Sequence, residues 1–276
     1  MQAKLPPNPK GIRVLKTIES DRLTTMYPSL PPSPKQCPTC GGTKQFLWYD
    51  DHDNIVSYEC SCAEQWILYR YLLYNGIERG YQRMGWRDIR TDTEIARSAK
   101  AYITDWPYNF SNGFGLYLHG TPGTGKTLLG TLVLKHVLGQ GYEGHFTTFN
   151  ELLDGYMGTW GDADAKAWFT RKVKNTGLLV IDDPGRENRE SKGSISRSTS
   201  LLDDVIRHRI AANLPTIITT NETPEDFSRA YGPNLKSLLS ERMEVREATG
   251  VDYRSTKRRE VESEREAHLT RPLVLA

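Results

Sequence analysis

From Gly115 onwards, short apolar runs rich in β-branched residues alternate with longer segments that have helical periodicity. Turn residues bound these runs, which therefore predict strands at residues 116–119, 145–149, 178–181 and 216–220. The segment between the first two runs is apolar along one helical face and ends at Gly139 or Gly141. Strands separated by helices of this length predict βαβ units, and so an α/β fold with a parallel sheet covered by helices on both faces.

Other segments carry weaker signals. The aromatic stretch 66–74 has the length of a helix closed by Gly76, and another helix is expected from about Thr93. Asn150 is expected to cap the helix that follows the second strand, and residues 201–210 form a further helix. The polar stretch 186–200 predicts a mobile surface loop, and the charged residues after Arg254 predict a helix or a frayed tail.

Composition narrows the class of protein. The 276 residues carry 36 basic and 34 acidic side chains, a net charge of +2 that excludes a polybasic tail protein. No apolar run approaches the 18 residues of a membrane-spanning helix, and the amino terminus has no apolar export signal. These features predict a soluble cytoplasmic protein without a membrane partner, whose four cysteines are reduced thiols or metal ligands.

The composition also predicts how the chain is divided. Seven of the 15 prolines lie in residues 1–36, and a proline density this high predicts an irregular arm. The expected parts are a proline-rich arm at 1–36, a cysteine-rich module with a helix at 37–76, a connector at 77–110, an α/β core at 111–255 and a charged tail at 256–276.

The strongest motif lies directly after the first strand of the core. Residues 120–127 fit the pattern G-x-x-x-x-G-K-[ST], in which glycines let backbone N–H groups point at phosphate oxygens. The helix that follows adds the positive end of its dipole, Lys126 is expected to reach the β- and γ-phosphates, and Thr127 is expected to bind Mg²⁺. The predicted phosphate-binding residues are Gly120, Thr121, Pro122, Gly123, Thr124, Gly125, Lys126 and Thr127.

Two further strands end in polar side chains. Residues 178–181 run into Asp182 and Asp183; the first is expected to hold Mg²⁺ and the second to activate or orient the attacking water. A solvated Asp-Asp-Pro-Gly turn is the alternative, although the phosphate loop favours the site. Asn221 ends the strand at 216–220 and either senses the γ-phosphate or the water, or caps the helix that begins near Pro224.

These motifs, in this order and spacing, resemble an AAA+ ATPase. Arg209, residues 240–243 and residues 250–254 further resemble the DnaC-type loaders of replicative helicases. The resemblance implies ATP as the nucleotide and a sheet of five strands, with residues 244–248 as the last strand and no carboxyl-terminal lid domain. It also implies that Arg242 acts as an arginine finger on the ATP of a neighbouring copy, and that Arg254 is a second sensor or a structural arginine.

One position departs from that family. The family usually has Asp-Glu where this chain has Asp182-Asp183. Because the shorter carboxylate lies about one methylene farther from the water, we expect hydrolysis to be slow or to need a partner.

The cysteines form a separate pattern within residues 37–62. Cys37 and Cys40 are followed by two glycines, and Cys60 and Cys62 supply a second pair. Four thiolates suit a closed tetrahedral structural Zn²⁺ site. The single residue between the second pair leaves His52 as a possible substitute for Cys62, and the ligand type also permits an iron–sulfur cluster.

Together these features predict an ATP-dependent helicase loader. The resemblance implies that the amino-terminal module binds the hexameric replicative helicase, while the ATPase core binds single-stranded DNA and self-associates. Arg79, Arg83, Arg87 and Arg90 are candidates for DNA contacts or simply a solvated face. The alternatives are an IstB-type transposition ATPase and an adaptor that binds nucleotide without hydrolysing it.

Overall fold

The computed structural model describes residues 45–49, 55–89, 93–184, 195–267 and 271–275. The chain divides into two compact units, one formed by residues 1–83 with 271–274 and the other by residues 84–270 with 275–276. The five sequence-based parts given above stay predictions. Each unit is described by itself below.

The larger unit is built on a parallel sheet of five strands in the order β4-β5-β6-β3-β7. Its strands are β3 (Gly115–Gly120), β4 (Gly144–Thr148), β5 (Leu178–Asp182), β6 (Thr216–Thr219) and β7 (Met243–Ala248). All five strands lie where the sequence predicts them, including the last one, and the predicted α/β fold class is confirmed.

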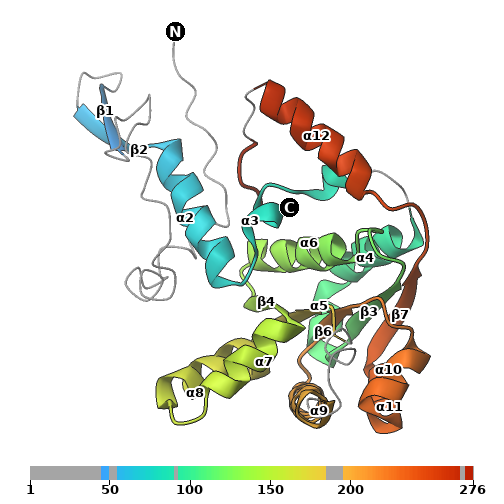
Figure 1. Ribbon diagram of the computed structural model, residues 1–276. Helices are drawn as coiled ribbons and strands as arrows, with labels where there is room; N and C mark the ends of the chain where they lie inside the picture. The colour runs from blue at the N-terminus through green and yellow to red at the C-terminus, as the bar shows by residue number, and fades with distance from the viewer. Residues whose placement is uncertain (1–44, 50–54, 90–92, 185–194, 268–270, 276) are drawn as a thin grey trace. The chain divides into compact units, whose positions relative to one another are not determined.

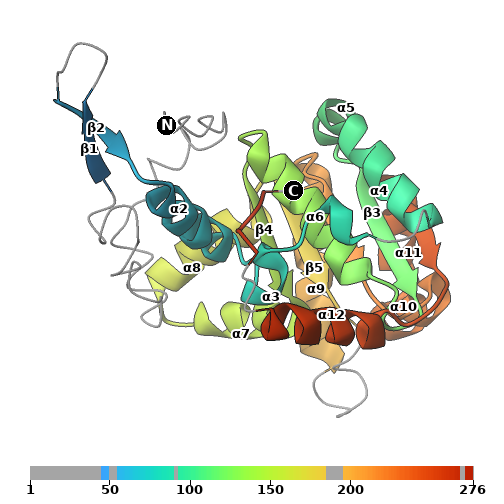
Figure 2. The same ribbon diagram turned by 90° about the horizontal axis from the view of Figure 1, so that it is seen from above.

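Helices cover both faces of this sheet. Figure 1 shows α6 and α4 on one side of the strands and α9, α10 and α11 on the other, and Figure 2 shows α4 beside α6 from above. The helical elements of this unit are η2 (Trp86–Asp88), α4 (Glu94–Thr104), α5 (Trp106–Asn112), α6 (Lys126–Gly139), α7 (Phe149–Gly158), α8 (Ala163–Phe169), η3 (Thr170–Lys174), α9 (Ile195–Ala211), α10 (Pro224–Tyr231), α11 (Pro233–Arg242) and α12 (Arg254–Glu266).

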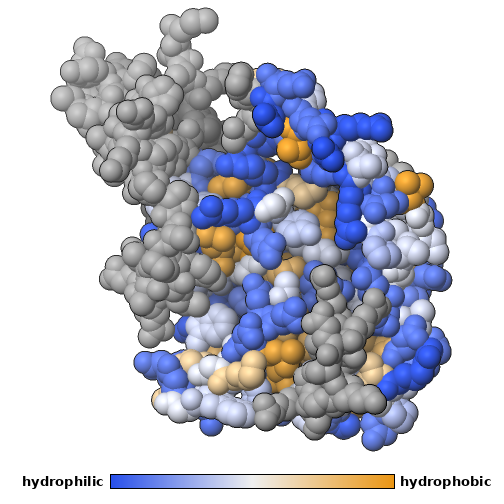
Figure 3. Space-filling view, viewed as in Figure 1, coloured by the Kyte–Doolittle hydropathy of each residue, from blue (hydrophilic) through white to orange (hydrophobic). Residues whose placement is uncertain are grey.

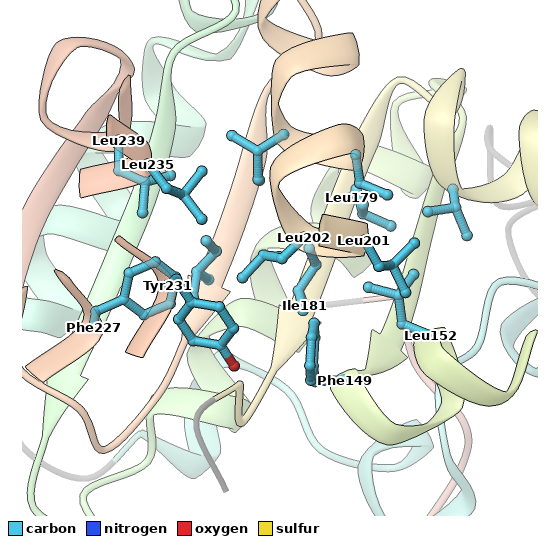
Figure 4. Packing of buried hydrophobic residues seen from close by; sticks show 14 of the residues in the cluster. Phe149, Leu152, Leu179, Ile181, Leu201, Leu202, Phe227, Tyr231, Leu235 and Leu239 are labelled. Atoms are coloured by element: carbon cyan, nitrogen blue, oxygen red, sulfur yellow. The ribbon is translucent and has the colours of Figure 1, made fainter. Parts of the chain in front are cut away.

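The core follows from the alternation of side chains along the strands. Leu179 and Ile181 of β5 face α9, where they pack with Leu201 and Leu202 (Figure 4). Val180 lies between them in the sequence and points to the opposite face, against Gly130 of α6. Both faces of the central strands are therefore buried, as expected of a parallel sheet between helices.

Two local predictions are wrong, and one alternative is excluded. The cap of α7 is Thr148, whose hydroxyl accepts from Glu151 N while the Glu151 carboxylate accepts from Thr148 N, so Asn150 lies inside the helix. The cap of α10 is Thr223, which excludes the capping alternative for Asn221. The predicted loop at 186–200 ends earlier, because residues 195–200 belong to α9; residues 186–194 lie outside the described part of the chain. Thr93, by contrast, caps α4 where the sequence predicts a helix to begin.

The smaller unit contains an antiparallel pair, β1 (Gln45–Tyr49) and β2 (Ile55–Glu59), followed by α2 (Ser61–Tyr74) and α3 (Arg79–Gln82). The helix predicted at 66–74 is confirmed within α2. Gly76 follows it with a φ of 78°, and Ile77 N donates to Leu72 O, a hydrogen bond typical of a helix closed by glycine.

The last helix of the larger unit differs from the others. None of the residues of α12 is buried, and Figure 3 shows its surface as largely hydrophilic. The residues after Arg254 therefore form a helix, one of the two outcomes that the sequence allows. Across the described ranges, none of the helices is both long and apolar enough to span a membrane.

Candidate nucleotide-binding site

The carboxyl-terminal edge of the parallel sheet gathers the polar residues of the candidate site. Strands β3, β5 and β6 end there at Gly120, Asp182 and Thr219, and Asp182 is paired in register with Thr219. In open α/β sheets, ligands bind outside the carboxyl ends of the strands. The fold thus brings the predicted phosphate loop, the predicted acidic pair and Asn221 to one place.

The phosphate loop connects β3 to the first turn of α6. Gly125 caps α6 with a φ of 90°, a left-handed conformation that other residues rarely adopt. Gly123 has a φ of 79°, and a Cβ there would lie 2.0 Å from Asp252 Oδ1. Both positions therefore require glycine, and the loop delivers the positive end of the α6 dipole to the site.

Lys126 is the central cation of the site and is buried. Its Nζ donates to Gly120 O at 2.9 Å, Thr121 O at 2.8 Å and Asn221 Oδ1 at 3.0 Å. Burial lowers the pKa of Lys126, while Asp182 and Asp183 oppose this shift. The ammonium group is thus poised on neutral oxygen acceptors that an anionic ligand can replace.

Asp182 links the phosphate loop to the sheet. Its Oδ1 accepts from Thr127 Oγ1 at 2.9 Å and also from the Thr219 hydroxyl. Burial raises the pKa of Asp182, and the two hydroxyl donors counteract that rise. A hydroxyl and a carboxylate in direct contact beside a phosphate loop are a donor set of hard oxygens, which fits Mg²⁺.

Asp183 follows with a φ of 57°, which is unusual for a residue other than glycine. Its N donates to Thr219 O at 2.7 Å, which holds the turn against β6. Asn221 Nδ2 lies 3.4 Å from Asp183 Oδ1, so Asn221 contacts both Lys126 and Asp183. A water molecule or phosphate placed near Asp183 would meet the Asn221 side chain as well.

Thr219 and Thr220 are site residues that the sequence analysis missed. The Thr219 hydroxyl donates to Asp182, and Thr220 Oγ1 donates to Pro184 O at 2.8 Å. Asn221 adds a contact to Asp183, so the side chains of residues 219–221 together contact residues 182–184. The available signal was the run Thr-Thr-Asn after an apolar strand, but threonine is also a common strand residue.

The turn at residues 252–254 lies against the phosphate loop. Tyr253 N donates to Gly123 O at 3.0 Å, and Asp252 Oδ1 accepts from Arg254 N at 2.9 Å. The charge of Arg254 contributes to the lowered pKa of Lys126, which places this exposed guanidinium in the electrostatic surroundings of the site. The predicted second sensor is therefore near the phosphate loop.

Arg242 is not part of this arrangement. It ends α11 directly before β7, whose first residue Met243 is paired with Gly115, whereas Gly120 is paired with Ala248 at the other end. Six residue steps from Arg242 to Ala248 place Arg242 about 20 Å from the carboxyl-terminal edge of the sheet, where the predicted phosphate loop lies and which is called the phosphate edge below. Its Nη1 donates to Asn112 O at 3.3 Å, and its side chain is about one-third exposed, at 31%.

The predicted zinc ligands are only partly described. Cys37, Cys40 and the alternative ligand His52 lie outside the described residues. Cys60 is buried and directly precedes α2, and Cys62 lies in the first turn of that helix. Within the described ranges, no three side chains among His, Cys, Asp and Glu are grouped to hold a metal ion, so the zinc site stays a prediction.

Comparison with known proteins finds similarities in the larger unit. Residues 116–246 match the model of the ATPase family associated with various cellular activities (AAA). The chain is 26% identical over 133 residues to the replicative helicase loader DnaI of Bacillus subtilis (strain 168). That match covers 47% of this chain and 41% of DnaI, so it spans less than half the length of this curated relative.

Two solved structures have the same fold. The crystal structure of the DnaC helicase loader matches with a TM-score of 0.54 and 24% identity, covering 62% of this chain and 100% of that chain. The crystal structure of DnaI matches with a TM-score of 0.52 and 19% identity, covering 64% of this chain and 94% of that chain. At these identities the two structures support the fold.

Proposed function

We propose that this chain, whose residues 116–246 match the AAA ATPase family model and which is similar over 133 residues to the helicase loader DnaI, is an ATP-dependent loader of a replicative DNA helicase. The observation that carries the proposal is the sequence relationship to DnaI, which is a helicase loader. The site geometry supports the ATP-dependent part, since a phosphate loop, an acidic pair and Asn221 meet at one sheet edge.

In this proposal the phosphate edge binds Mg·ATP. Lys126 exchanges its contacts with Gly120 O and Thr121 O for the β- and γ-phosphate oxygens. Thr127 and Asp182 hold Mg²⁺, which, when bound, offsets negative charge on the phosphates. The residues at positions 120–125, except Pro122, which has no backbone N–H, supply backbone N–H donors to the same phosphates.

Hydrolysis then depends on the second carboxylate. Asp183 takes a proton from the attacking water or orients it, and Asn221, which contacts Asp183, holds the water or the γ-phosphate. Because aspartate reaches less far than the glutamate usual in this family, turnover is slow in the isolated protein. Because the shorter side chain leaves the water poorly positioned, a partner or DNA that improves its position stimulates turnover.

Arg242 acts on a neighbouring copy. The distance of Arg242 from its own phosphate edge supports this role, because a cation at the opposite edge can reach a γ-phosphate only across an interface between copies. ATP therefore joins two copies, and its hydrolysis loosens the assembly.

The remaining parts of the proposal concern partners. The amino-terminal zinc module, with Cys37, Cys40, Cys60 and Cys62 as ligands, binds the hexameric helicase, and the core binds single-stranded DNA in the cytoplasm. The spacing of the four cysteines and the relationship to DnaI support these assignments.

The test is association with the replicative helicase of the source organism, measured by size-exclusion chromatography with light scattering, with and without Mg·ATP. We expect a stable complex whose amount depends on nucleotide, and the same experiment with Lys126→Ala as control should lose that dependence. No complex under any nucleotide condition would contradict loading.

Two other functions predict different outcomes. An IstB-type transposition ATPase would form no helicase complex and would be stimulated by double-stranded DNA. A nucleotide-bound adaptor would bind the helicase and ATP without releasing phosphate. Phosphate release measured with single-stranded and double-stranded DNA therefore separates the three.

A further inference from the structure

Thr219 contacts both carboxylate residues of the candidate site, one through its side chain and one through its backbone. Its hydroxyl donates to Asp182 Oδ1, and its carbonyl oxygen accepts from Asp183 N at 2.7 Å. Thr219 is buried, with 1% of its surface exposed, so these contacts are shielded from water. A residue of this kind can set the positions of both acids at once.

Packing explains why the hydroxyl points at Asp182. The Thr219 Cγ2 atom lies 3.2 Å from the position that a Cβ on Gly130 would occupy, so the methyl group packs on α6 where that helix has no side chain. The χ1 torsion of threonine is restricted, so the position of the methyl group also fixes the direction of Oγ1. With the methyl group against α6, Oγ1 donates to Asp182 Oδ1. The register that pairs Asp182 with Thr219 places the two side chains on the same face of the sheet.

The two hydroxyl donors to Asp182 use only one of its two carboxylate oxygens. Thr127 and Thr219 both donate to Oδ1, so neither occupies Oδ2. A carboxylate offers about four acceptor positions, and those on Oδ2 remain for a cation or its water shell. Thr127, by donating its proton to Asp182, keeps its own oxygen lone pairs available to the same cation.

We propose that Thr219 is the positioning residue that orients Asp182 for Mg²⁺. This inference rests on the proposed Mg·ATP site, and it adds a residue that the motif of the acidic pair does not contain. Groups that hydrogen-bond to metal-binding carboxylates orient them, and their loss lowers metal affinity roughly 10- to 100-fold.

The test is the Mg²⁺ dependence of nucleotide binding by the full-length protein. The affinity for a fluorescent ATP analogue is measured over a series of Mg²⁺ concentrations. Thr219→Val keeps the branched shape and the methyl contact but removes the hydroxyl. We expect the Mg²⁺ concentration for half-maximal effect to rise roughly 10-fold or more, with affinity in the absence of Mg²⁺ unchanged.

Matched variants isolate the hydroxyl. Thr147→Val removes another buried threonine hydroxyl, from β4, and should leave the Mg²⁺ dependence unchanged. Thr219→Ser and Thr219→Ala both lack the methyl group and differ only in the hydroxyl, so they answer the question even if Thr219→Val folds poorly. We expect the Mg²⁺ dependence of Thr219→Ser to equal that of the wild type, and that of Thr219→Ala to equal that of Thr219→Val.

A Thr219→Val protein with the same Mg²⁺ dependence as Thr147→Val would overturn the inference, and so would identical serine and alanine variants. Either result would leave the proposed function standing, because the wild type would still bind Mg·ATP. A wild-type protein that binds no nucleotide would overturn both proposals.

Discussion

Lys126 and Arg209 are buried cations at opposite edges of the same sheet, and the protein holds them differently. Lys126 lies at the carboxyl-terminal edge and donates to two loop carbonyls and to Asn221. Arg209 lies where β5 and β6 begin, and its guanidinium donates to Thr216 and to five main-chain carbonyls. Those carbonyls belong to Val173, Lys174, Thr176, Gly177 and Pro215.

The difference lies in what can replace the acceptors. The acceptors of Lys126 border a loop built for phosphate, and the carboxylates of Asp182 and Asp183 favour its charged form. Arg209 donates directly to no carboxylate among the described residues, and burial lowers its pKa to about 9. Its donors join the ends of η3, β5 and β6. Lys126 therefore has three acceptors beside the predicted phosphate loop, whereas Arg209 is a fixed structural link between three elements.

Arg242 shares the amino-terminal edge with Arg209 but is partly exposed. Its guanidinium donates to Asn112 O and lies 3.3 Å from the Glu241 carboxylate, and the proposal above assigns it to the ATP of a second copy. The predictions below test whether the two edges work separately in one chain and together in an assembly.

The largest expected effect is the loss of ATP turnover when Arg242 of one copy no longer reaches the phosphate edge of its neighbour. Arg242→Ala should lower ATP turnover roughly 10³-fold without changing nucleotide affinity, since the arginine acts on the neighbour's phosphate. Lys126→Ala should be equally inactive because it loses its own site. An equal mixture of the two variants should recover part of the turnover, because an intact site of one meets an intact Arg242 of the other.

The control is a mixture of Arg242→Ala with the Arg242→Ala, Lys126→Ala double variant, which should recover nothing. Turnover is measured as phosphate release over a range of protein concentrations. If the first mixture also recovers nothing while light scattering shows mixed assemblies, Arg242 does not act between copies.

A smaller effect is expected within the phosphate edge. Asp183→Asn should lower turnover roughly 10²-fold, because the amide cannot accept the proton of the attacking water. Asp183→Glu should raise turnover above the wild type, since the longer side chain brings the carboxylate closer to the water. Phosphate release and the affinity for Mg·ATP are measured together, with the exposed Asp164→Asn as control. A slower Asp183→Glu protein would show that aspartate is the better fit here.

The smallest effect on chemistry, and the clearest one on stability, is expected at the opposite edge. Arg209→Met should lower the free energy of unfolding by about 3 kcal/mol, because several buried carbonyls lose their donor. Arg207→Met is the matched control on the same helix: its side chain is half exposed and pairs with Asp203, so a much smaller loss is expected. Urea unfolding gives both values, and equal losses would refute the structural role of Arg209.

Local signals predicted most of the fold. Four of the five strands have a β-rich run bounded by turn residues, whereas β7 was expected only from the family resemblance; the helix after the phosphate loop has an apolar periodicity. The errors occurred where neighbouring residues compete for the same role. Asn150 and Thr148 are both good caps, and Glu151, three residues after Thr148, decided between them. Residues 195–200 are polar yet helical, and Ser198 is buried, which composition alone does not reveal.

The site shows the same limit. The phosphate loop, Asp182, Asp183 and Asn221 are recognisable because their residue types are rare in that order after apolar strands. Thr219 has no such signal, since a threonine near the end of a strand is ordinary. Its importance comes from the strand register that pairs it with Asp182 and from the glycine of α6 that receives its methyl group.

Local sequence patterns were enough to predict the succession of strands and helices along the chain and the chemical groups of the candidate site, because both depend on spacing over a few residues. Only the tertiary structure decided which side chains contact one another there. It also placed Arg242 about 20 Å from the phosphate edge and buried Arg209 among carbonyls. The order of the strands across the sheet, their register and the burial of side chains arise from contacts between residues far apart in the chain, and no local pattern contains those contacts.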